Sequence, residues 1–382
     1  MPEYIYLDYN ATTPVLHEVR LEMDRVMKNA WGNPSSSHML GQKAKRELET
    51  ARKRLSSLIN CKPSEIVFTS GGTESNNMAI IGCAMRSAQK GRHLITTRIE
   101  HPSVLNPFVH LMEQGFEVDF VGPDKTGVVD AKKLATFIRS DTTFCSVMLA
   151  NNETGALQPV SEIGKTCRQK GIIFHVDAAQ AVGKIPVDVS TLQVDLMTIA
   201  GHKLYAPKGI GALYVREGTE IENIMFGAGQ EGGRRPGTEP VPGACALGMA
   251  ASIMKELIFQ EMERQARLRE LLFDRLSSYV DGIVRFVPAQ KCLPNTLSVS
   301  FPGISGGELL AAVPSVLAST GAACHDRSVS ISHVLSAMGV EKRVALGMVR
   351  MSLGIHTKEE DVEEAAKSLG KEAARLMAGA KS

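Results

Sequence analysis

Short runs of mainly apolar residues alternate with longer amphipathic stretches over much of the chain. Runs of this kind, rich in β-branched residues, are typical of buried strands, whereas apolar residues recurring every three to four positions predict helices. The predicted strands are residues 65–69, 93–99, 117–121, 143–150, 172–177, 195–200 and 211–216. Because helical patterns separate most of them, the order predicts an α/β fold with a mainly parallel sheet covered on both faces.

Helices are predicted on both sides of this region and within it. The helical stretches are residues 16–29, 42–59, 74–89, 102–114, 131–139 and 162–170. After Gly243 the pattern changes to one long helix, 244–276, followed by a mixture of strands (such as 296–301) and helices. This part is typical of a smaller α+β domain. A capping box of Thr357 and Glu360 predicts where the last helix begins.

The composition narrows the class of protein. With 382 residues, 43% hydrophobic and 22% charged, the chain is long enough for two domains with sizeable cores. A formal charge of +2 gives no basic excess for nucleic acid or an anionic membrane. The N-terminus contains acids and no signal-like apolar region, and no run approaches the ~20 apolar residues of a membrane span. We therefore expect a soluble protein that binds neither.

The cysteines indicate the compartment. Seven are scattered along the chain, with no C-x-x-C pair and no histidine at zinc spacing. An odd number of cysteines without the spacing of a disulfide framework favours a reduced, cytoplasmic protein. Its thiols are expected to be mostly buried, and no metal site is expected. Cys83, inside an apolar helical run, is expected to be of that kind.

A lysine and an aspartate follow two neighbouring predicted strands. Lys203 comes just after the strand 195–200, and Asp177 ends the strand 172–177. Open α/β sheets bind ligands at the carboxyl ends of their strands. A Schiff-base lysine and a carboxylate for a pyridinium nitrogen are what a pyridoxal phosphate (PLP) site needs. Alone, such a lysine is usually a solvated loop cation and such an aspartate a turn residue, so the hypothesis depends on further residues.

Further polar residues follow the other strands. Gly72 and Thr73 join the first strand to a helix, where free N–H groups and close backbone approach favour an anion such as phosphate. His101 follows the second strand and could lie over a ring, although a lone histidine is more often structural. Asn152 follows the fourth strand, and Gln180 lies on the face of Asp177 if a helix begins there.

Two residues in the last third of the chain complete the set. Cys324 lies in a small, polar segment, where an exposed thiol could act as a nucleophile. Arg350 precedes the final helix, and its guanidinium group could bind a substrate carboxylate with two hydrogen bonds. Most such arginines form surface ion pairs instead.

Taken in order, these motifs resemble the cysteine desulfurases of the NifS/IscS type and the related selenocysteine lyases, in the class V aminotransferase group. The resemblance runs from Leu-Asp-Tyr-Asn-Ala-Thr-Thr-Pro (residues 7–14) to Arg-Met-Ser-Leu-Gly (350–354). It implies an aspartate-aminotransferase-type fold (fold type I) with a seven-stranded sheet, and a homodimer with active sites between subunits. The large PLP-binding domain would span 13–260, and the small domain, 1–12 and 261–382, would carry the catalytic cysteine loop.

The resemblance also implies a role for each residue. Lys203 would be the Schiff-base lysine, with Asp177 at the pyridine nitrogen and His101 stacked on the ring. The other cofactor ligands would be Gln180 and Asn152 near the phenolic oxygen, and Gly72, Thr73, His202 and, from the other subunit, Thr238 near the phosphate. Arg350, with the loop of Asn33 alongside, would hold the substrate carboxylate, and Cys324 would accept the sulfur.

The implied activity is conversion of L-cysteine to L-alanine, with sulfur held as a persulfide for an acceptor or scaffold protein in iron–sulfur cluster or thio-cofactor assembly. The sequences Gly-Ala-Ala-Cys-His (321–325) and Arg-Pro-Gly-Thr (235–238) are more similar to selenocysteine lyases, which release selenium from L-selenocysteine. Against this, Pro102 stands where selenium-selective animal lyases carry an acid. Ala200 stands where many members carry a serine, which removes one phosphate hydrogen bond.

The residues alone leave three other classes of protein open. A PLP aminotransferase or β-lyase would use Lys203 and Asp177 but not the thiol. A cysteine hydrolase would use Cys324 without PLP, and a non-catalytic scaffold would use neither.

Overall fold

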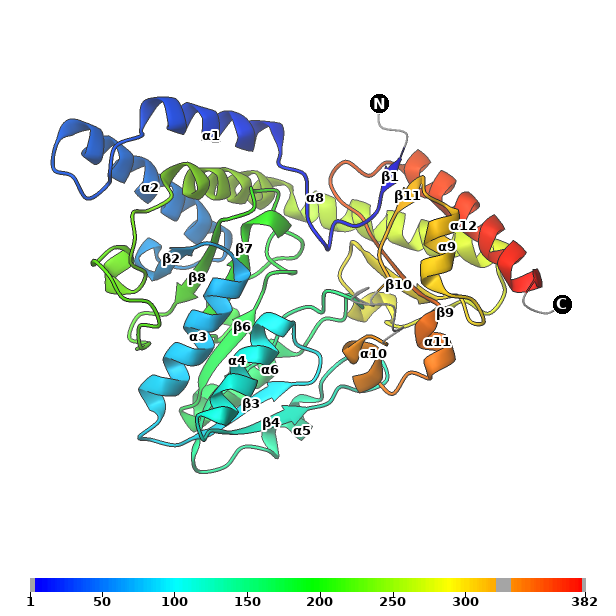
Figure 1. Cartoon of the computed structure of the whole chain (residues 1–382), viewed down its shortest axis with the longest axis horizontal. Coiled ribbons are helices and arrows are strands. Elements are labelled where there is room, and N and C mark those ends of the chain that lie inside the picture. The colour runs from blue at the N-terminus through cyan, green and yellow to red at the C-terminus, as the bar shows by residue number, and fades with distance from the viewer. Residues whose placement is uncertain (1–3, 321–330, 380–382) are drawn as a thin grey trace.

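The structure is a computed structural model that describes residues 4–320 and 331–379, and the main sheet within this part of the chain has seven strands in the order β2-β8-β7-β6-β5-β3-β4 (Figure 1). The strands are β2 (Ile66–Thr69), β3 (His93–Thr97), β4 (Glu117–Val121), β5 (Thr142–Ser146), β6 (Ile173–Asp177), β7 (Leu196–Ala200) and β8 (Gly211–Val215). β8 is antiparallel to both neighbours, and the other strands are mutually parallel. The predicted α/β fold with a mainly parallel sheet is confirmed.

Both faces of this sheet are covered by helices, as its alternating side chains require. Val67, Leu94 and Phe144 point to one face and pack against α3 (Gly72–Ser87) and α4 (Pro102–Glu113). The next side chains along the same strands, Phe68, Ile95 and Cys145, point to the opposite face. The helices that cover this face are α1 (His17–Asn29), α2 (Met39–Leu58), α6 (Val160–Lys170) and the first half of α8 (Val241–Tyr279). The sheet and these helices form the large lobe.

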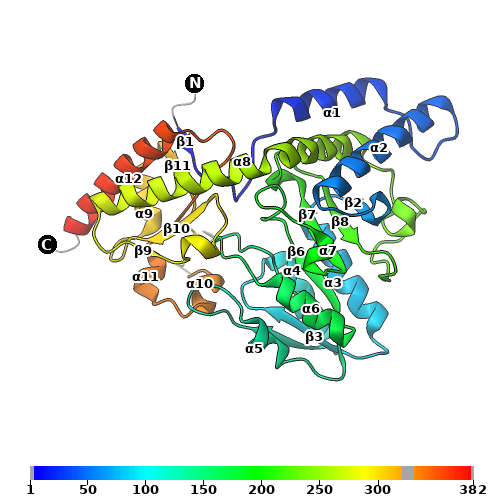
Figure 2. The same ribbon diagram turned by 180° about the vertical axis from the view of Figure 1, so that it is seen from behind.

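A small lobe lies beside the large one and is joined to it by α8, which runs along both (Figures 1 and 2). Its antiparallel sheet contains β9 (Val284–Arg285), β10 (Thr296–Ser300) and β12 (Met348–Ser352). It is covered by α9 (Gly306–Ala312), α12 (Glu359–Gly379) and the end of α8, around a separate apolar core. The predicted division after residue 260 falls inside the continuous helix α8 and stays a prediction.

The remaining elements are short. The N-terminal strand β1 (Ile5–Tyr6) pairs in parallel with β11 (Val316–Leu317), which places the start of the chain on the small lobe. The other short elements are α5 (Ala131–Ala135), α7 (Val189–Leu192), α10 (His333–Ala337), α11 (Lys342–Leu346) and the 3₁₀ turns Pro63–Glu65, Gly201–Lys203, Glu231–Gly233 and Ala289–Lys291.

The predicted capping box at the last helix is wrong. The Thr357 hydroxyl accepts a hydrogen bond from the N–H of Gly354 (3.0 Å), so it closes the preceding turn. The N–H of Lys358 donates to the Asp361 carboxylate (2.8 Å), and α12 therefore begins at Glu359. The predicted helix start was one residue too early, because Asp361, and not Glu360, is the acid in the first turn whose side chain bonds back to the residue before the helix.

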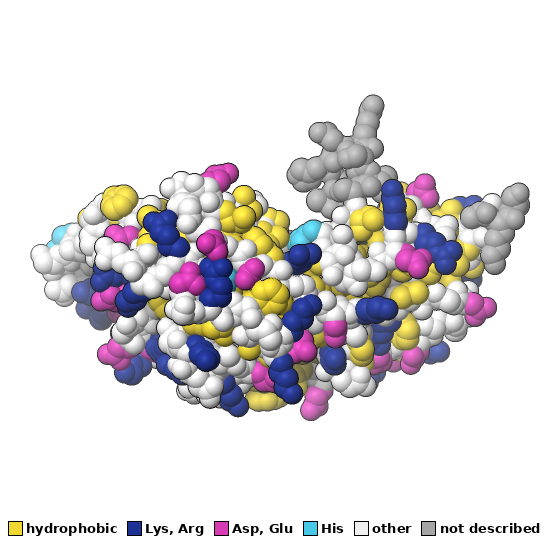
Figure 3. Space-filling view, turned by 90° about the horizontal axis from the view of Figure 1, so that it is seen from below, with side chains coloured by type: hydrophobic (Ala, Val, Ile, Leu, Met, Phe, Trp, Pro, Cys, Tyr) yellow, Lys and Arg dark blue, Asp and Glu magenta, His cyan; other side chains and the backbone are white. Residues whose placement is uncertain are grey.

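By length and composition, α8 could cross a membrane, within the range of residues described. More than half of its most apolar window is buried, and it packs against α1, α2 and α12. This is the behaviour of a core helix. Cys83 is buried, as predicted. On the face shown in Figure 3, side chains of Lys and Arg are interspersed with those of Asp and Glu.

Candidate active site

A cavity of about 270 Å³ lies where the carboxyl ends of the parallel strands meet the small lobe. Its volume is close to the ~300 Å³ at which small-molecule sites begin. The predicted site residues that line it are Gly72, Thr73, His101, Asn152, Asp177, Gln180, His202, Lys203 and Arg350. The structure thus brings together residues that span nearly 280 positions of the chain.

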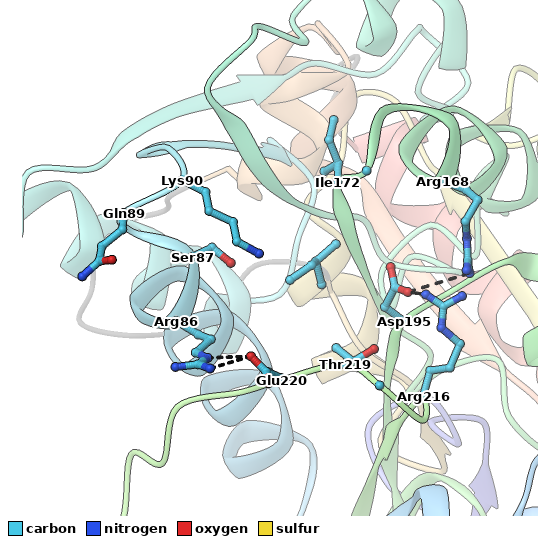
Figure 4. A pocket seen from close by; sticks show the side chains of 13 residues that line it. Arg86, Ser87, Gln89, Lys90, Arg168, Ile172, Asp195, Arg216, Thr219 and Glu220 are labelled. Atoms are coloured by element: carbon cyan, nitrogen blue, oxygen red, sulfur yellow. Dashed lines mark hydrogen bonds and ion pairs between the residues drawn. The ribbon is translucent and has the colours of Figure 1, made fainter.

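A larger cavity, of about 510 Å³, lies at the amino ends of β6 and β7 (Figure 4). Most of its charged side chains are paired with one another: Arg86 with Glu220, and Arg168 and Arg216 with Asp195. Ligands of open α/β sheets bind at the other end of the strands. We therefore place the active site in the smaller cavity.

Lys203 lies in the turn Gly201–Lys203 that follows β7, and its amine points back across the cavity. Its Nζ donates to the carbonyl oxygens of Asn10 (2.5 Å) and Ala11 (2.6 Å). Burial and, next, the positive charge of Arg350 lower the pKa of Lys203 to about 8. A substantial share of this amine is therefore neutral, and nucleophilic, near neutral pH.

Asp177 ends β6 beside Lys203, and its carboxylate is held in one orientation. Oδ2 accepts from Asn76 Nδ2 (2.8 Å), and Oδ1 accepts from the N–H of Ala179 (2.9 Å). Asn76 comes from the second turn of α3, and its own Oδ1 is buried without a partner in the part of the chain that the structure describes.

The N-terminus of α3 opens into the same cavity through Gly72 and Thr73. The first N–H groups of a helix lack intrahelical partners and carry a positive partial charge, so this end favours an anion. Ala200 faces it, because a Cβ added to Gly72 would lie 3.5 Å from the Ala200 Cβ. Burial and, next, the charge of Lys203 lower the pKa of His202 to about 4, so its ring is neutral.

His101 is the N-cap of α4 and also lines the cavity. Its Nδ1 accepts from the N–H of Ser103 (3.1 Å), so the neutral ring carries its proton on Nε2. Burial is the main cause that lowers the pKa of His101, with a further lowering from Lys203 that Asp177 opposes.

Arg350 reaches the cavity from β12 of the small lobe. Its Nη1 donates to the carbonyl of Asn152 (2.9 Å), and its Nη2 forms an ion pair with Asp8. Arg350 Nε is buried and has no partner among the described residues. The loop that carries Asn152 is fixed in turn by Asn151, whose Oδ1 accepts from the N–H of Glu153 and of Thr154.

Three predicted residues lie elsewhere or outside the description. Asn33 is exposed in the turn between α1 and α2, and Thr238 precedes α8; neither lines the cavity of a single chain. Cys324 lies outside the described residues. The roles of all three stay predictions. Gln180 does line the cavity, but it lies in a series of turns and not in a helix that begins at Asp177.

Sequence reasoning missed Asn10 and Lys184. Asn10 is buried and contacts Lys203, and Lys184 donates to both Asn10 and Gln180. Each had a weak signal: Asn10 belongs to the opening motif at residues 7–14, and Lys184 comes four residues after Gln180. Neither signal shows that two segments 170 residues apart would meet.

Comparisons with known proteins agree with this geometry. A model of the aminotransferase class-V family matches residues 5–364. The chain is 42% identical over 364 residues to the cysteine desulfurase IscS of Dictyoglomus turgidum, covering 95% of this chain and 92% of that protein.

Among solved structures, a NifS-like protein aligns with a TM-score of 0.91 and 37% identity, covering 96% of this chain and 98% of that one. SspA in complex with cysteine aligns with a TM-score of 0.80 and 34% identity, covering 91% and 98%. The chain therefore belongs to the class-V aminotransferase family, within its group of IscS- and NifS-like cysteine desulfurases.

Proposed function

We propose that this protein is a PLP-dependent cysteine desulfurase that converts L-cysteine to L-alanine and takes the sulfur onto Cys324 as a persulfide. The observation that carries the proposal is one cavity that is lined by a partly buried lysine with a pKa of about 8, an oriented aspartate and a buried arginine.

The residues present fit PLP. The α3 N-terminus with Gly72, Thr73 and His202 would hold the phosphate, Asp177 the ring nitrogen, and Gln180 and Asn152 the phenolic oxygen. His101 would stack on the ring. The buried Asn76 Oδ1 and Arg350 Nε, which the described protein leaves without partners, are the kind of polar atoms that a ligand satisfies.

When bound, the cofactor supplies an electron sink for the negative charge that develops at the substrate Cα. Asp177, held by Asn76 and Ala179, keeps a proton at the ring nitrogen. The neutral amine of Lys203 takes the Cα proton as a general base. The planar guanidinium of Arg350 suits the substrate carboxylate, which it can bind with two hydrogen bonds.

Arg350 must exchange Asp8 for that carboxylate. Its guanidinium is already fixed by Asn152 and by the fold of β12, so little side-chain freedom is lost when substrate binds. We assign Arg350 to substrate binding, with the loop of Asn33 alongside it in the assembled enzyme.

The sulfur step uses the thiolate of Cys324. It attacks Sγ of the substrate, an S–S bond forms, and the Cβ–S bond breaks with its electron pair passing to the carbon skeleton. A proton from solvent at Cβ and the return to Cα of the proton held by Lys203 complete alanine, and the enzyme keeps a persulfide. Acceptor or scaffold proteins would then receive this sulfur for iron–sulfur cluster or thio-cofactor assembly.

Cysteine is favoured over selenocysteine as the substrate, because a similar protein was solved in complex with cysteine and the similar IscS is named a cysteine desulfurase. We further propose a cytoplasmic homodimer, since Thr238 lies outside the cavity of its own chain and would complete the phosphate site of a second subunit.

The test compares the unaltered protein with Cys324→Ser and Lys203→Ala. Purified with PLP, the unaltered protein should absorb visible light, give a borohydride-stable adduct on Lys203 by mass spectrometry, and form alanine and sulfide in equal amounts from cysteine and a thiol reductant. Cys324→Ser should keep the adduct and lose sulfide, whereas Lys203→Ala should lose both. A colourless protein without an adduct would refute the proposal, and undiminished sulfide from Cys324→Ser would identify a β-lyase.

A further inference from the structure

We propose that Lys184 is a positioning residue that fixes the amide of Gln180 so that one of its N–H groups, and not its oxygen, faces the cofactor. The inference rests on the proposed function, because it concerns the group that would contact the phenolic oxygen of PLP.

The contacts of Gln180 determine its orientation. Gln180 is buried, its Oε1 accepts from Lys184 Nζ (2.7 Å), and its Nε2 donates to the carbonyl oxygen of Asn10 (2.9 Å). A flipped amide would place two donors against each other at Lys184 and two acceptors against each other at Asn10. An amide NH₂ has two hydrogens, so after the bond to Asn10 one donor remains for the cavity.

Lys184 is itself held in place on three sides. Its Nζ also donates to Asn10 Oδ1 (2.7 Å), which accepts in addition from Asn295 Nδ2 (3.1 Å) of the small lobe. Its backbone N–H donates to the carbonyl of Ala181 (2.9 Å). The preceding Gly183 has φ +82, and a Cβ there would collide with the Leu204 side chain, next to Lys203. The turn therefore aims Lys184 at Gln180.

The charged neighbours of Lys184 make its position costly. The side chain is partly buried, and burial, followed by the charges of Lys203 and Arg350, lowers its pKa well below the usual value. Burying an amine near two other cations is unfavourable. Its two hydrogen bonds to amide oxygens orient those amides, which a lysine at the surface would not do. Both amide oxygens accept whether the amine is charged or neutral.

The consequence concerns the protonation state of the bound chromophore. A donor at the phenolic oxygen stabilises its more negative, deprotonated state, so losing that donor should raise the pH midpoint of the visible absorbance change. Removing the charge of Lys184 by itself would act in the same direction. The two causes are separated by a double-mutant cycle with Gln180.

The experiment titrates the visible absorbance of the PLP-loaded protein against pH for four proteins: unaltered, Lys184→Met, Gln180→Ala and the double variant. We expect Lys184→Met to raise the midpoint by about one pH unit, a tenfold change in proton affinity, and to change it by less than about 0.3 unit in the Gln180→Ala background. Lys184→Arg, which keeps the donors, should restore the midpoint. Exposed Lys165→Met is the matched control and should leave it unchanged.

An equal shift in both backgrounds would overturn the proposal, since it would show a through-space effect of charge alone. No shift from Lys184→Met in the native background would overturn it as well. If Lys184→Met does not fold, as judged by circular dichroism, the same cycle with Lys184→Gln decides by the same criterion. The borohydride adduct on Lys203 of the unaltered protein is measured in parallel. Its absence would refute the proposed function, whereas its presence with a failed cycle refutes only the role of Lys184.

Discussion

The reactivity of Lys203 gives the sharpest quantitative test of the site. Its pKa falls from the usual 10.5 to about 8, chiefly through burial and secondarily through Arg350. The perturbation is a pH series on the cofactor-free protein. The predicted outcome is that the amine reacts as a neutral nucleophile at a pH where ordinary lysines are protonated.

The magnitude follows from the two pKa values. At about pH 7.5, an amine with pKa 10.5 is roughly 0.1% neutral and one with a pKa of about 8 is roughly 24% neutral, which is about a 240-fold difference. Above about pH 9 the amine should already be almost fully neutral, so its reactivity should level off. An ordinary lysine would still gain about tenfold per pH unit there.

The assay is brief labelling with acetic anhydride, with a lysine-containing model peptide in the same tube as the reference. Mass spectrometry of the peptide that carries Lys203 gives its labelling rate relative to the model peptide. A pulse at about pH 11 corrects this ratio of labelling rates for the accessibility of Lys203. The ratio should be constant at low pH and fall above about pH 8, where Lys203 is already neutral and the model peptide is still gaining reactivity. In Arg350→Gln the midpoint should rise by less than the full shift, because burial is the larger cause, and Arg350→Lys should keep it low.

A labelling profile that rises without levelling up to about pH 10.5 would refute the reasoning, because it would show that the amine is solvated. The result would also remove the argument for Lys203 as the general base. A low midpoint that Arg350→Gln leaves unchanged would retain burial as the cause and exclude the contribution of Arg350.

Three further predictions concern the scaffold of the site. Gly183→Ala should lower the free energy of unfolding by about 3 kcal/mol in urea titrations, since it combines a positive φ with a collision against Leu204. Ala200→Ser should tighten PLP binding by about tenfold in fluorescence titrations, because its hydroxyl adds a hydrogen bond to the phosphate. Glu231→Gln should cost about 3 kcal/mol of unfolding free energy, because the buried Glu231 carboxylate accepts from Arg52 and from the N–H of Phe68.

Matched variants give the outcomes that would contradict these predictions. Gly209 has φ +84, and no atom of the described residues lies within 4 Å of an added Cβ, so Gly209→Ala should cost only the backbone strain, about 1 kcal/mol. Equal losses at the two glycines would remove the packing argument. Ala200→Val adds volume without a donor and should not tighten PLP binding. Glu217→Gln, at the exposed pair with Lys62, should leave stability unchanged, and a loss equal to that of Glu231→Gln would contradict the role of burial.

The large lobe could be predicted from the sequence because its strands, apart from β4 at the edge, are almost entirely buried. Strands that are buried on both faces are typically mainly apolar runs. The ends of elements were less predictable. The strand predicted over 143–150 leaves the ladder after Ser146, although the N–H groups of Val147 and Leu149 still bond to β6. The helix predicted over 131–139 ends at Ala135, where the Thr136 hydroxyl bonds to the carbonyl of Lys133 (2.7 Å). Local side-chain hydrogen bonds of this kind are invisible to a periodic pattern.

The site was predictable where it follows the strands. Asp177 ends its strand, and His101 and Lys203 come a few residues after theirs. The rule that open α/β sheets bind ligands at the carboxyl ends of their strands therefore predicted that the three would meet. Arg350 belongs to another sheet, and only the family resemblance connected it to the others. The antiparallel direction of β8 also had a usable signal, because the segment between Ala200 and Gly211 is shorter than a parallel crossover requires.

Asn10 shows why the rest of the site was beyond local reasoning. Its carbonyl oxygen accepts from Lys203 and Gln180, its Oδ1 accepts from Lys184 and from Asn295, and its N–H donates to Ser352. These partners lie between 170 and 342 positions away and belong to both lobes. A single buried residue therefore couples the placement of the small lobe to the environment of the Lys203 amine. Because that amine owes its low pKa mainly to burial, any shift of the small lobe that opens the contact with Asn10 must also raise the pKa of Lys203 and weaken it as a nucleophile.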